Sequence, residues 1–380
     1  MKSGTTSLWT YLLSHTDVIP LTSADIDPEG KYHVMADKEV RFFNDPAYSD
    51  LVKTYGKSDA IDFYLDLFPL IPPPGVRSSD LMLMTNQGRI TGEATPMYVG
   101  LPGTASRIKE ALPHVKIIML LRNPVDRAYS DYWFRKSLKT SNRDIFQTSG
   151  KLSHSEIFGK CVEMELEIAR MCGMHNWAAS PSLQGAAVLW ACQKSMFFQI
   201  VAANETSSYC NPADKIHQSL CISAEVASNC QKLSTAFSLY APALFEYSQL
   251  FPQENLLILT SERFFERPAL LMNQVTEFLG LDQKDWSKVT QSTYNIVNPK
   301  RVAGSKQHLV TSSKGLQIGQ SESPSEYPPL DPSVRSKLIQ LMVPYNQMIS
   351  SLLPGLSIDH WGKDAPLNPK IERATRPNPI

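Results

Sequence analysis

The chain has 380 residues, and its 37 Lys and Arg residues equal its 37 Asp and Glu residues, so the formal net charge is zero. This balance gives no global field that favours nucleic acid or a membrane surface, and a polyanionic partner would need a local basic patch. With 42% apolar and 19% charged residues, the composition is that of a globular protein with one large α/β domain or two smaller ones. No apolar run reaches the length of about 18 residues that spans a bilayer, and no signal peptide opens the chain.

The chain opens on small and hydroxyl-bearing residues that predict an anion-binding loop. Residues 2–7 run directly into an apolar helical pattern that starts at Leu8. In such a loop the backbone N–H groups point into one concavity at a helix N-terminus, and Lys2 adds a full positive charge. The loop lacks the Gly-Lys-Ser/Thr ending of a Walker A sequence. The alternative interpretation is a capped surface helix that happens to follow a lysine.

Buried strands followed by helices predict a parallel sheet. Residues 115–121 and 255–259 are nearly continuous apolar runs, which suit strands covered on both faces, and residues 32–43 predict a short strand that ends near Lys38. Asn123 is a predicted N-cap, with Pro124 in the first helical position. Strands that alternate with helices in this way favour a parallel sheet flanked by helices, with ligands at the carboxyl ends of the strands.

Further helices are predicted in the second half of the chain. They span residues 155–171, residues 224–251 with a kink at Pro242, residues 268–279 with a stop at Gly280, and a last helix opened by Asp331. The tail, residues 363–380, is rich in Pro and charge and is expected to be poorly ordered.

Residues 136–235 interrupt this alternation, and we interpret them as an insertion in a single domain of residues 1–362. All six cysteines lie within the insertion, and their spacings match no zinc-binding pattern. They predict disulfides formed in an oxidising lumen and leave the pairing open; the alternative is a set of buried free thiols. Asn204 begins a glycosylation sequon in the same window. The cysteines are Cys161, Cys172, Cys192, Cys210, Cys221 and Cys230.

Two pairs of residues at predicted strand ends are candidates for binding and chemistry. Arg122 leaves a buried strand and can grip a phosphate through two parallel hydrogen bonds, and Ser130 lies about two turns into the next helix. Glu39 can accept a proton from an attacking hydroxyl, while Lys38 steadies the transferring group. The alternatives are an Arg122 paired with Asp126, a solvent-facing Ser130, and an ordinary Lys38–Glu39 surface pair.

Taken together, these segments resemble the Golgi carbohydrate sulfotransferases, of the heparan sulfate sulfotransferase or N-acetylgalactosamine 4-sulfate 6-O-sulfotransferase type. The resemblance covers roughly residues 1–135 and 236–361 and leaves out the cysteine-bearing insertion. Three departures weaken a heparan sulfate assignment and leave the acceptor open. Ala94 stands where heparan sulfate members often carry a lysine, and Arg41 replaces a frequent histidine. No cysteine follows Cys230, whereas heparan sulfate members usually carry a cysteine pair near the C-terminus. The segments that carry the resemblance, in chain order, are residues 2–8, 38–43, 92–96, 121–130 and 313–315.

The resemblance implies roles for individual residues. The opening loop holds the 5′-phosphosulfate of 3′-phosphoadenosine 5′-phosphosulfate (PAPS), and Arg122 with Ser130 holds the 3′-phosphate. Lys314 and Gly315 close over the nucleotide. The implied catalytic residues are Glu39 as the base, Lys2 and Lys38. The implied PAPS-binding residues are Lys2, Ser3, Gly4, Thr5, Thr6, Ser7, Arg122, Ser130, Lys314 and Gly315.

The expected fold is therefore α/β, a P-loop-like parallel sheet flanked by helices with a cysteine-rich, mostly helical insertion. The expected function is transfer of a sulfuryl group from PAPS to a glycan hydroxyl, with 3′-phosphoadenosine 5′-phosphate as product, no metal and no nucleic acid. The acceptor is expected to be an anionic polysaccharide, with N-acetylgalactosamine 4-sulfate 6-O-sulfation as one specific expectation. Two alternatives remain: a catalytically impaired nucleotide-binding homologue, and a P-loop kinase.

The resemblance also predicts the compartment. Relatives carry a strand immediately before the opening loop, and an N-terminal membrane anchor and stem before the domain. The chain is therefore expected to be N-terminally truncated, with the full-length protein anchored in the membrane and facing the Golgi lumen.

Overall fold

The computed structural model describes residues 3–21, 38–44, 47–68, 89–139, 151–205, 236–291 and 328–362, together with residues 223, 226, 229 and 230. The strands are β1 (Val18–Ile19), β2 (Ile90–Thr91), β3 (Ile117–Leu121) and β4 (Leu256–Thr260). The helices of the first part are α1 (Thr5–Leu12), α2 (Ala47–Tyr55), α3 (Lys57–Asp66), α4 (Thr104–Ala111) and α5 (Pro124–Lys139), with the 3₁₀ turn η3 (Tyr98–Gly100).

The second part of the chain is mainly helical. Its helices are α6 (His154–Met171), α7 (Met174–Ala179), α8 (Leu183–Glu205), α10 (Ala241–Leu250), α11 (Ser261–Glu266), α12 (Pro268–Leu279) and α13 (Pro332–Leu352). The described residues of this part also form the 3₁₀ turns η5 (Ala236–Ser238), η6 (Gln253–Asn255), η7 (Val289–Gln291) and η8 (Asp359–Gly362).

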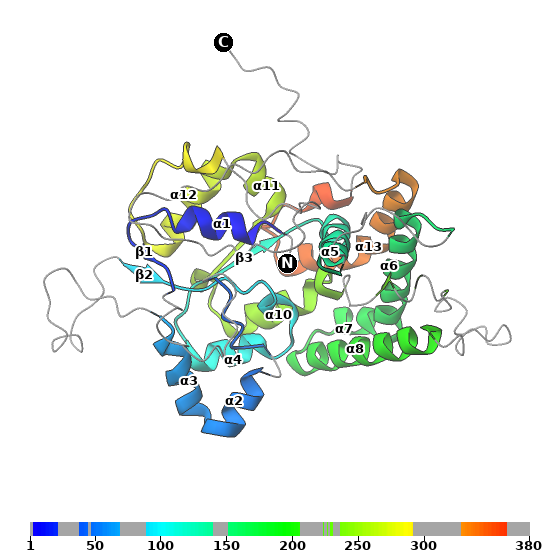
Figure 1. Ribbon diagram of the computed structural model, residues 1–380, viewed down its shortest axis with the longest axis horizontal. Coiled ribbons are helices and arrows are strands. Elements are labelled where there is room, and N and C mark those ends of the chain that lie inside the picture. Colours follow the sequence, from blue (N-terminus) through cyan, green and yellow to red (C-terminus); the bar gives the residue numbers. More distant parts are fainter. Residues whose placement is uncertain are drawn as a thin grey trace, which may run out of the picture.

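Two parallel strand pairs organise the fold. β1 pairs with β2, and β3 pairs with β4 over five residues, from Ile117 opposite Leu256 to Leu121 opposite Thr260. Successive side chains of β3 enter different clusters: Leu120 packs with Leu8 of α1, whereas Met119 and Leu121 join the larger core. Figure 1 shows the same arrangement, with α1 and α12 on one side of β3 and α4 and α10 on the other. The predicted parallel strands with both faces covered are therefore confirmed.

Helix ends follow the predicted capping signals. Asn123 Oδ1 accepts hydrogen bonds from the N–H groups of Val125 and Asp126, at 3.0 and 3.4 Å, and α5 begins at Pro124. Gly280 ends α12 in the left-handed conformation, with φ 75°. Asp331 caps α13 by accepting from the N–H groups of Ser333 and Val334. The signals predicted these boundaries because they satisfy terminal N–H and C=O groups locally.

The predicted long helix over residues 224–251 is wrong. Val226 and Asn229 are helical, but Cys230 is not, and the described residues that follow form the 3₁₀ turn η5 and then a separate helix, α10, that starts at Ala241. Pro242 lies in the first turn of α10 and does not kink a longer helix. Proline has no N–H to donate, which costs nothing in a first turn where that N–H has no helical partner.

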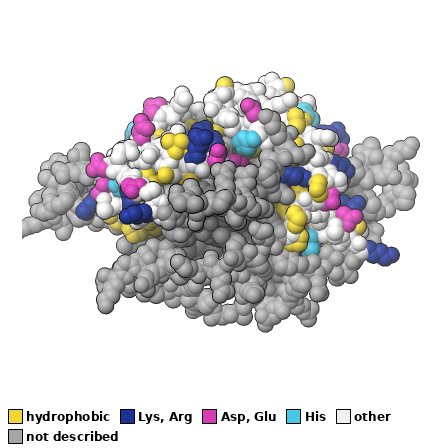
Figure 2. All heavy atoms as spheres, turned by 90° about the horizontal axis from the view of Figure 1, so that it is seen from above, with side chains coloured by type: hydrophobic (Ala, Val, Ile, Leu, Met, Phe, Trp, Pro, Cys, Tyr) yellow, Lys and Arg dark blue, Asp and Glu magenta, His cyan; other side chains and the backbone are white. Residues whose placement is uncertain are grey.

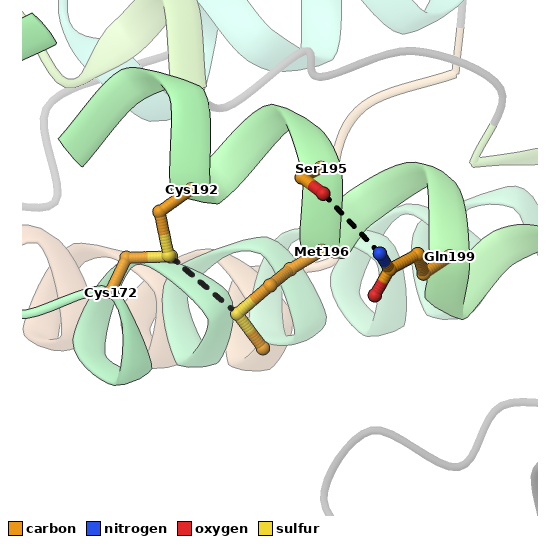
Figure 3. The surroundings of a disulfide bond; sticks show 5 residues. All are labelled: Cys172, Cys192, Ser195, Met196 and Gln199. Atoms are coloured by element: carbon orange, nitrogen blue, oxygen red, sulfur yellow. Dashed lines mark hydrogen bonds between the residues drawn. A yellow bond between two sulfur atoms is a disulfide. The ribbon is translucent and has the colours of Figure 1, made fainter. Parts of the chain in front are cut away.

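The insertion is helical, and two disulfides tie it together. Cys161 of α6 bonds to Cys230, and Cys172, at the end of α6, bonds to Cys192 of α8, with Cα–Cα distances of 5.4 and 5.8 Å. Figure 3 shows Met196 of α8 against the second bridge, its Sδ 3.5 Å from Cys172 Sγ. Since a disulfide sulfur carries no hydrogen, this is a packing contact between sulfur atoms. Cys210 and Cys221 lie outside the described residues.

We expect both disulfides to stabilise the fold, the longer-range one more strongly. Cys172 and Cys192 are 20 residues apart and Cys161 and Cys230 are 69 apart. Because a crosslink restricts the unfolded chain, Cys172→Ser with Cys192→Ser should lower the free energy of unfolding by about 3 kcal/mol, and Cys161→Ser with Cys230→Ser by about 4 kcal/mol. Urea denaturation of the two double variants measures both values. Midpoints equal to that of the wild type would show that the bridges do not restrict the unfolded state.

Candidate functional site

The carboxyl ends of β3 and β4 bring the opening loop beside Arg122. Arg122 follows Leu121, which pairs with Thr260, and Ser261 follows Thr260 directly. The hydroxyl of Ser261 donates a hydrogen bond to the carbonyl of Ser3. The start of the chain and the end of β3 therefore meet at the same edge of the sheet, where a parallel sheet places its ligands.

Gly4 lets the opening loop approach this edge closely. It precedes α1 with φ 93°, a left-handed conformation that side-chain-bearing residues rarely adopt. A Cβ atom at Gly4 would lie 2.6 Å from Cζ of Phe265 in α11 and 3.6 Å from Cδ2 of Leu120 in β3. The backbone angle therefore favours glycine, and a side chain at this position would also have to displace the Phe265 ring.

The hydroxyl groups of the opening loop differ in their exposure. Thr5 and Thr6, in the first turn of α1, are half-buried, whereas Ser7 is fully buried and Ser3 is buried. The threonine hydroxyls and the first N–H groups of α1 are therefore the groups of this loop that an anion can approach. Lys2 lies outside the described residues, as do Lys314 and Gly315.

Lys38 and Glu39 are brought to the same loop from a different part of the chain. Lys38 Nζ lies 3.5 Å from Thr5 Oγ1, 3.4 Å from Thr6 Oγ1 and 3.3 Å from Glu39 Oε1. Only 7% of the Lys38 side chain and 15% of the Glu39 side chain are exposed. The interpretation as an ordinary surface pair is therefore wrong, because both side chains are largely enclosed against the opening loop.

The enclosure changes the acidity of Lys38. Burial lowers the pKa of Lys38 from its ordinary value and outweighs the opposing effect of the Glu39 carboxylate. A desolvated ammonium beside hydroxyl donors is strongly attracted to an anion, since water does not screen it. Glu39 also accepts a hydrogen bond from Arg41 Nη2 at 3.1 Å, so cationic groups contact both of its oxygens.

Arg122 precedes α5, and Ser130 lies about two turns into this helix. The carbonyl of Arg122 accepts a hydrogen bond of 2.9 Å from the Tyr240 hydroxyl, and Ser130 is only 4% exposed. The alternative of a solvent-facing Ser130 is therefore wrong. Asp126 forms a buried bidentate pair with Arg335 of α13, at 2.5 and 3.2 Å.

A buried carboxylate that the sequence patterns do not single out follows β2. It belongs to Glu93, in the segment 92–96 that carries the resemblance, directly before Ala94, where heparan sulfate members often carry a lysine. The carboxylate accepts hydrogen bonds from Val40 N–H and from the hydroxyls of Tyr64, Thr95 and Tyr98. In the sequence, the signal that could have identified Glu93 is its position directly before the atypical Ala94. The sequence alone does not show that segments distant from Glu93 supply partners for its carboxylate.

Among the described residues, no group of three or more His, Cys, Asp and Glu side chains lies close enough together to hold a metal ion. The arrangement can instead bind an anion with N–H groups, hydroxyls and Lys38, and it presents the Glu39 carboxylate beside that anion. Such an arrangement suits group transfer to a hydroxyl or an amine, with the carboxylate as proton acceptor.

Comparison with known proteins identifies sulfotransferases as relatives of this chain. A membrane-associated sulfotransferase, kil1 of Dictyostelium discoideum, is 34% identical over 134 residues, which is 35% of this chain and 21% of that protein. The bifunctional heparan sulfate N-deacetylase/N-sulfotransferases of Drosophila melanogaster and, as form 2, of Homo sapiens are each 31% identical over 136 residues. That segment is 36% of this chain and 11% and 12% of the two proteins, so the match spans a small part of these relatives' length.

A solved sulfotransferase structure from Alicyclobacillus acidocaldarius aligns with 95% of each chain, at a TM-score of 0.43 and 20% sequence identity. The sulfotransferase domain itself matches residues 2–338, which include every segment of the site described above. The chain therefore belongs to the sulfotransferase family, whose enzymes in general take the sulfuryl group from PAPS.

Proposed function

We propose that this chain transfers a sulfuryl group from PAPS to a hydroxyl group of a glycan, with Glu39 as the general base. The observation that carries the proposal is the contact of Lys38 with both Glu39 and the threonines of the opening loop. It places a proton acceptor and a cation together at a helix N-terminus suited to an anion. Family membership supplies the reaction class.

The proposed reaction is an in-line displacement at sulfur. The acceptor oxygen forms the new bond to sulfur while its proton passes to the Glu39 carboxylate. The bond between sulfur and the 5′-phosphate oxygen breaks, and that oxygen keeps the electron pair. The first N–H groups of α1, Lys38 and Lys2 stabilise the charge that grows on the departing 3′-phosphoadenosine 5′-phosphate; one such donor is typically worth about 3 kcal/mol.

The nucleotide is proposed to lie along the edge where β3 and β4 end. Residues 3–7 and Lys2 bind its 5′ side, and Arg122 with Ser130 binds its 3′-phosphate. Support comes from the hydrogen bond between Ser261 and Ser3, which holds the loop beside the residue after Leu121. Lys314 and Gly315 are proposed to cover the nucleotide.

The acceptor is proposed to be an anionic polysaccharide, by analogy with the heparan sulfate-directed relatives. Because those relatives are named as N-sulfotransferases, a glucosamine amine is a second candidate acceptor beside a hydroxyl. Sulfation at O6 of N-acetylgalactosamine 4-sulfate remains a third. Figure 2 shows basic and acidic side chains intermixed over the described part of one face, so recognition there would depend on local groups and not on a broad basic field.

We further propose that the insertion belongs to the same domain as the core, within residues 1–362, because α6 and α13 bury side chains in one hydrophobic cluster. Figure 1 shows α6, α7 and α8 gathered beside α5 and α13. The disulfides favour an oxidising compartment such as the Golgi lumen. None of the described helices is long and apolar enough to cross a membrane.

The test is a transfer assay with labelled PAPS and three acceptors: de-N-acetylated heparosan, which offers amines, fully desulfated N-acetylated heparan, which offers hydroxyls, and chondroitin 4-sulfate. Label on either hydroxyl acceptor supports the proposal, and label on the amine polymer alone supports the second candidate. Titration with 3′-phosphoadenosine 5′-phosphate separates the remaining alternative, because binding without transfer to any acceptor would indicate a catalytically impaired homologue. The kinase alternative is excluded by the family match.

A further inference from the structure

Glu93 binds the N–H groups of the turn that carries Glu39, directly or through the hydroxyl of Thr95. Its Oε2 accepts directly from Val40 N–H at 3.1 Å and from the Thr95 hydroxyl at 2.5 Å. Thr95 Oγ1 in turn accepts from Arg41 N–H at 3.0 Å. The N–H groups of Val40 and Arg41, the two residues after Glu39, are therefore both linked by hydrogen bonds to Oε2 of Glu93, the first directly and the second through the Thr95 hydroxyl.

The other oxygen of Glu93 holds the next part of the same turn. Oε1 accepts from the hydroxyls of Tyr98 at 2.7 Å and Tyr64 at 3.1 Å. Tyr98 Oη also accepts from Phe43 N–H at 3.3 Å. Tyr64 belongs to α3, so its hydroxyl links this helix to Glu93.

The segment around Glu93 also holds the residue before Glu39. Ala94 N–H donates to the carbonyl of Lys38 at 2.7 Å, so residues 38 to 41 lie along residues 93 to 95. Arg41 has φ 60°, which is uncommon for a residue with a side chain, and a turn that holds it there needs stabilising contacts. The hydrogen bond from Arg41 N–H to Thr95 is one such contact.

The hydrogen-bond pattern suits an ionised Glu93. Val40 N–H can only donate, and the hydroxyls of Tyr64, Thr95 and Tyr98 can donate as well, so a carboxylate without its proton can accept from all four neighbours. Burial raises the pKa of Glu93, and the hydrogen bonds from Thr95, Tyr98, Val40 and Tyr64 oppose that rise. Burial also raises the pKa of Tyr64 and of Tyr98 well above the ordinary value, so both hydroxyls keep the protons that they donate.

We propose that Glu93 is a positioning residue for sulfuryl transfer, which fixes Glu39 beside the opening loop by binding the backbone of residues 40–43. The inference rests on the proposed function, since it takes Glu39 as the base. Glu93 acts through the turn and not on the substrate, because its carboxylate oxygens are already occupied by four donors. A loosened turn would misplace the base, and a misplacement of about 1 Å can cost on the order of a hundredfold in rate.

The test compares Glu93→Ala and Glu93→Gln in the full chain. Glu93→Ala removes the acceptor for Val40 N–H, which cannot reorient, and we expect kcat to fall about a hundredfold. Glu93→Gln keeps one oxygen, and the Tyr64 hydroxyl can turn to accept from the new amide, so a fall of about tenfold is expected. The dissociation constant for 3′-phosphoadenosine 5′-phosphate should change less than about twofold in both, because the opening loop is intact.

Two controls separate positioning from a general loss of structure. Glu246→Gln alters another buried carboxylate with a raised pKa, outside the proposed site, and should leave kcat unchanged. In a Glu39→Gln background, Glu93→Ala should lower the residual rate less than about threefold, since its effect passes through Glu39. If Glu93→Ala does not fold, Glu93→Gln carries the same double-variant test.

The inference is overturned if kcat stays at the wild-type value in Glu93→Gln and Glu93→Ala, or if nucleotide binding falls in parallel with kcat. It is also overturned if Glu93→Ala lowers the rate equally with and without Glu39. Wild-type turnover in Glu39→Gln would overturn the proposed function itself, so the two failures are distinguishable.

Discussion

Glu39→Gln is expected to lower kcat by about 10²–10⁴-fold, while 3′-phosphoadenosine 5′-phosphate binds with nearly the wild-type affinity. The amide has the size of the carboxylate but cannot take the proton of the acceptor. Nucleotide binding survives because Lys38 keeps its contacts with Thr5 and Thr6, at 3.5 and 3.4 Å. Single-turnover transfer of label measures the rate, and calorimetric titration measures the affinity.

The matched control is Glu110→Gln. Its carboxylate is 53% exposed and pairs with Lys57 of α3, outside the proposed site, so kcat should equal that of the wild type. Glu39→Asp should keep part of the activity, since it retains a proton acceptor on a shorter side chain. Undiminished turnover in Glu39→Gln would rule out Glu39 as the base of the proposed reaction.

Arg335→Met is expected to lower the free energy of unfolding by about 3–5 kcal/mol, because it leaves the Asp126 carboxylate buried without its cation. The side chains of Arg335 and Asp126 are 7% and 10% exposed and make two hydrogen bonds. The pair joins α13 to the helix that carries Ser130. Urea denaturation measures the loss, and the variant should unfold at a clearly lower denaturant concentration.

Two variants make this prediction specific. Lys337→Met, on the same helix, removes an ion pair with Glu163 whose side chains are 59% and 38% exposed, so a change below about 1 kcal/mol is expected. Asp126→Leu combined with Arg335→Met should recover much of the stability, because neither charge is then left unpaired. If Lys337→Met and Arg335→Met lower the free energy of unfolding equally, burial does not make the Arg335–Asp126 pair more important for stability than the exposed pair.

Local signals predicted the elements that depend on neighbouring residues. The buried strands β3 and β4 appeared as short apolar runs, and Asn123, Gly280 and Asp331 marked helix ends, because caps satisfy backbone groups within a few residues. The helix over residues 224–251 failed because an apolar pattern cannot distinguish one long helix from a 3₁₀ turn followed by a shorter helix. The pattern predicts a kink at Pro242, whereas in the structure Pro242 lies in the first turn of α10.

Residue types and their order by themselves determined the family, the loop that suits an anion, and the candidates Lys38, Glu39, Arg122 and Ser130. Only the tertiary structure decided that Lys38 is enclosed against Thr5 and Thr6, that Asp126 belongs to Arg335, and that Glu93 binds the turn beside Glu39. Each of these contacts joins segments at least 30 residues apart in the printed sequence. Burial and pairing between such segments arise only when the sheet and helices pack. Loop composition and helix caps, in contrast, depend on residues that are close together in the sequence.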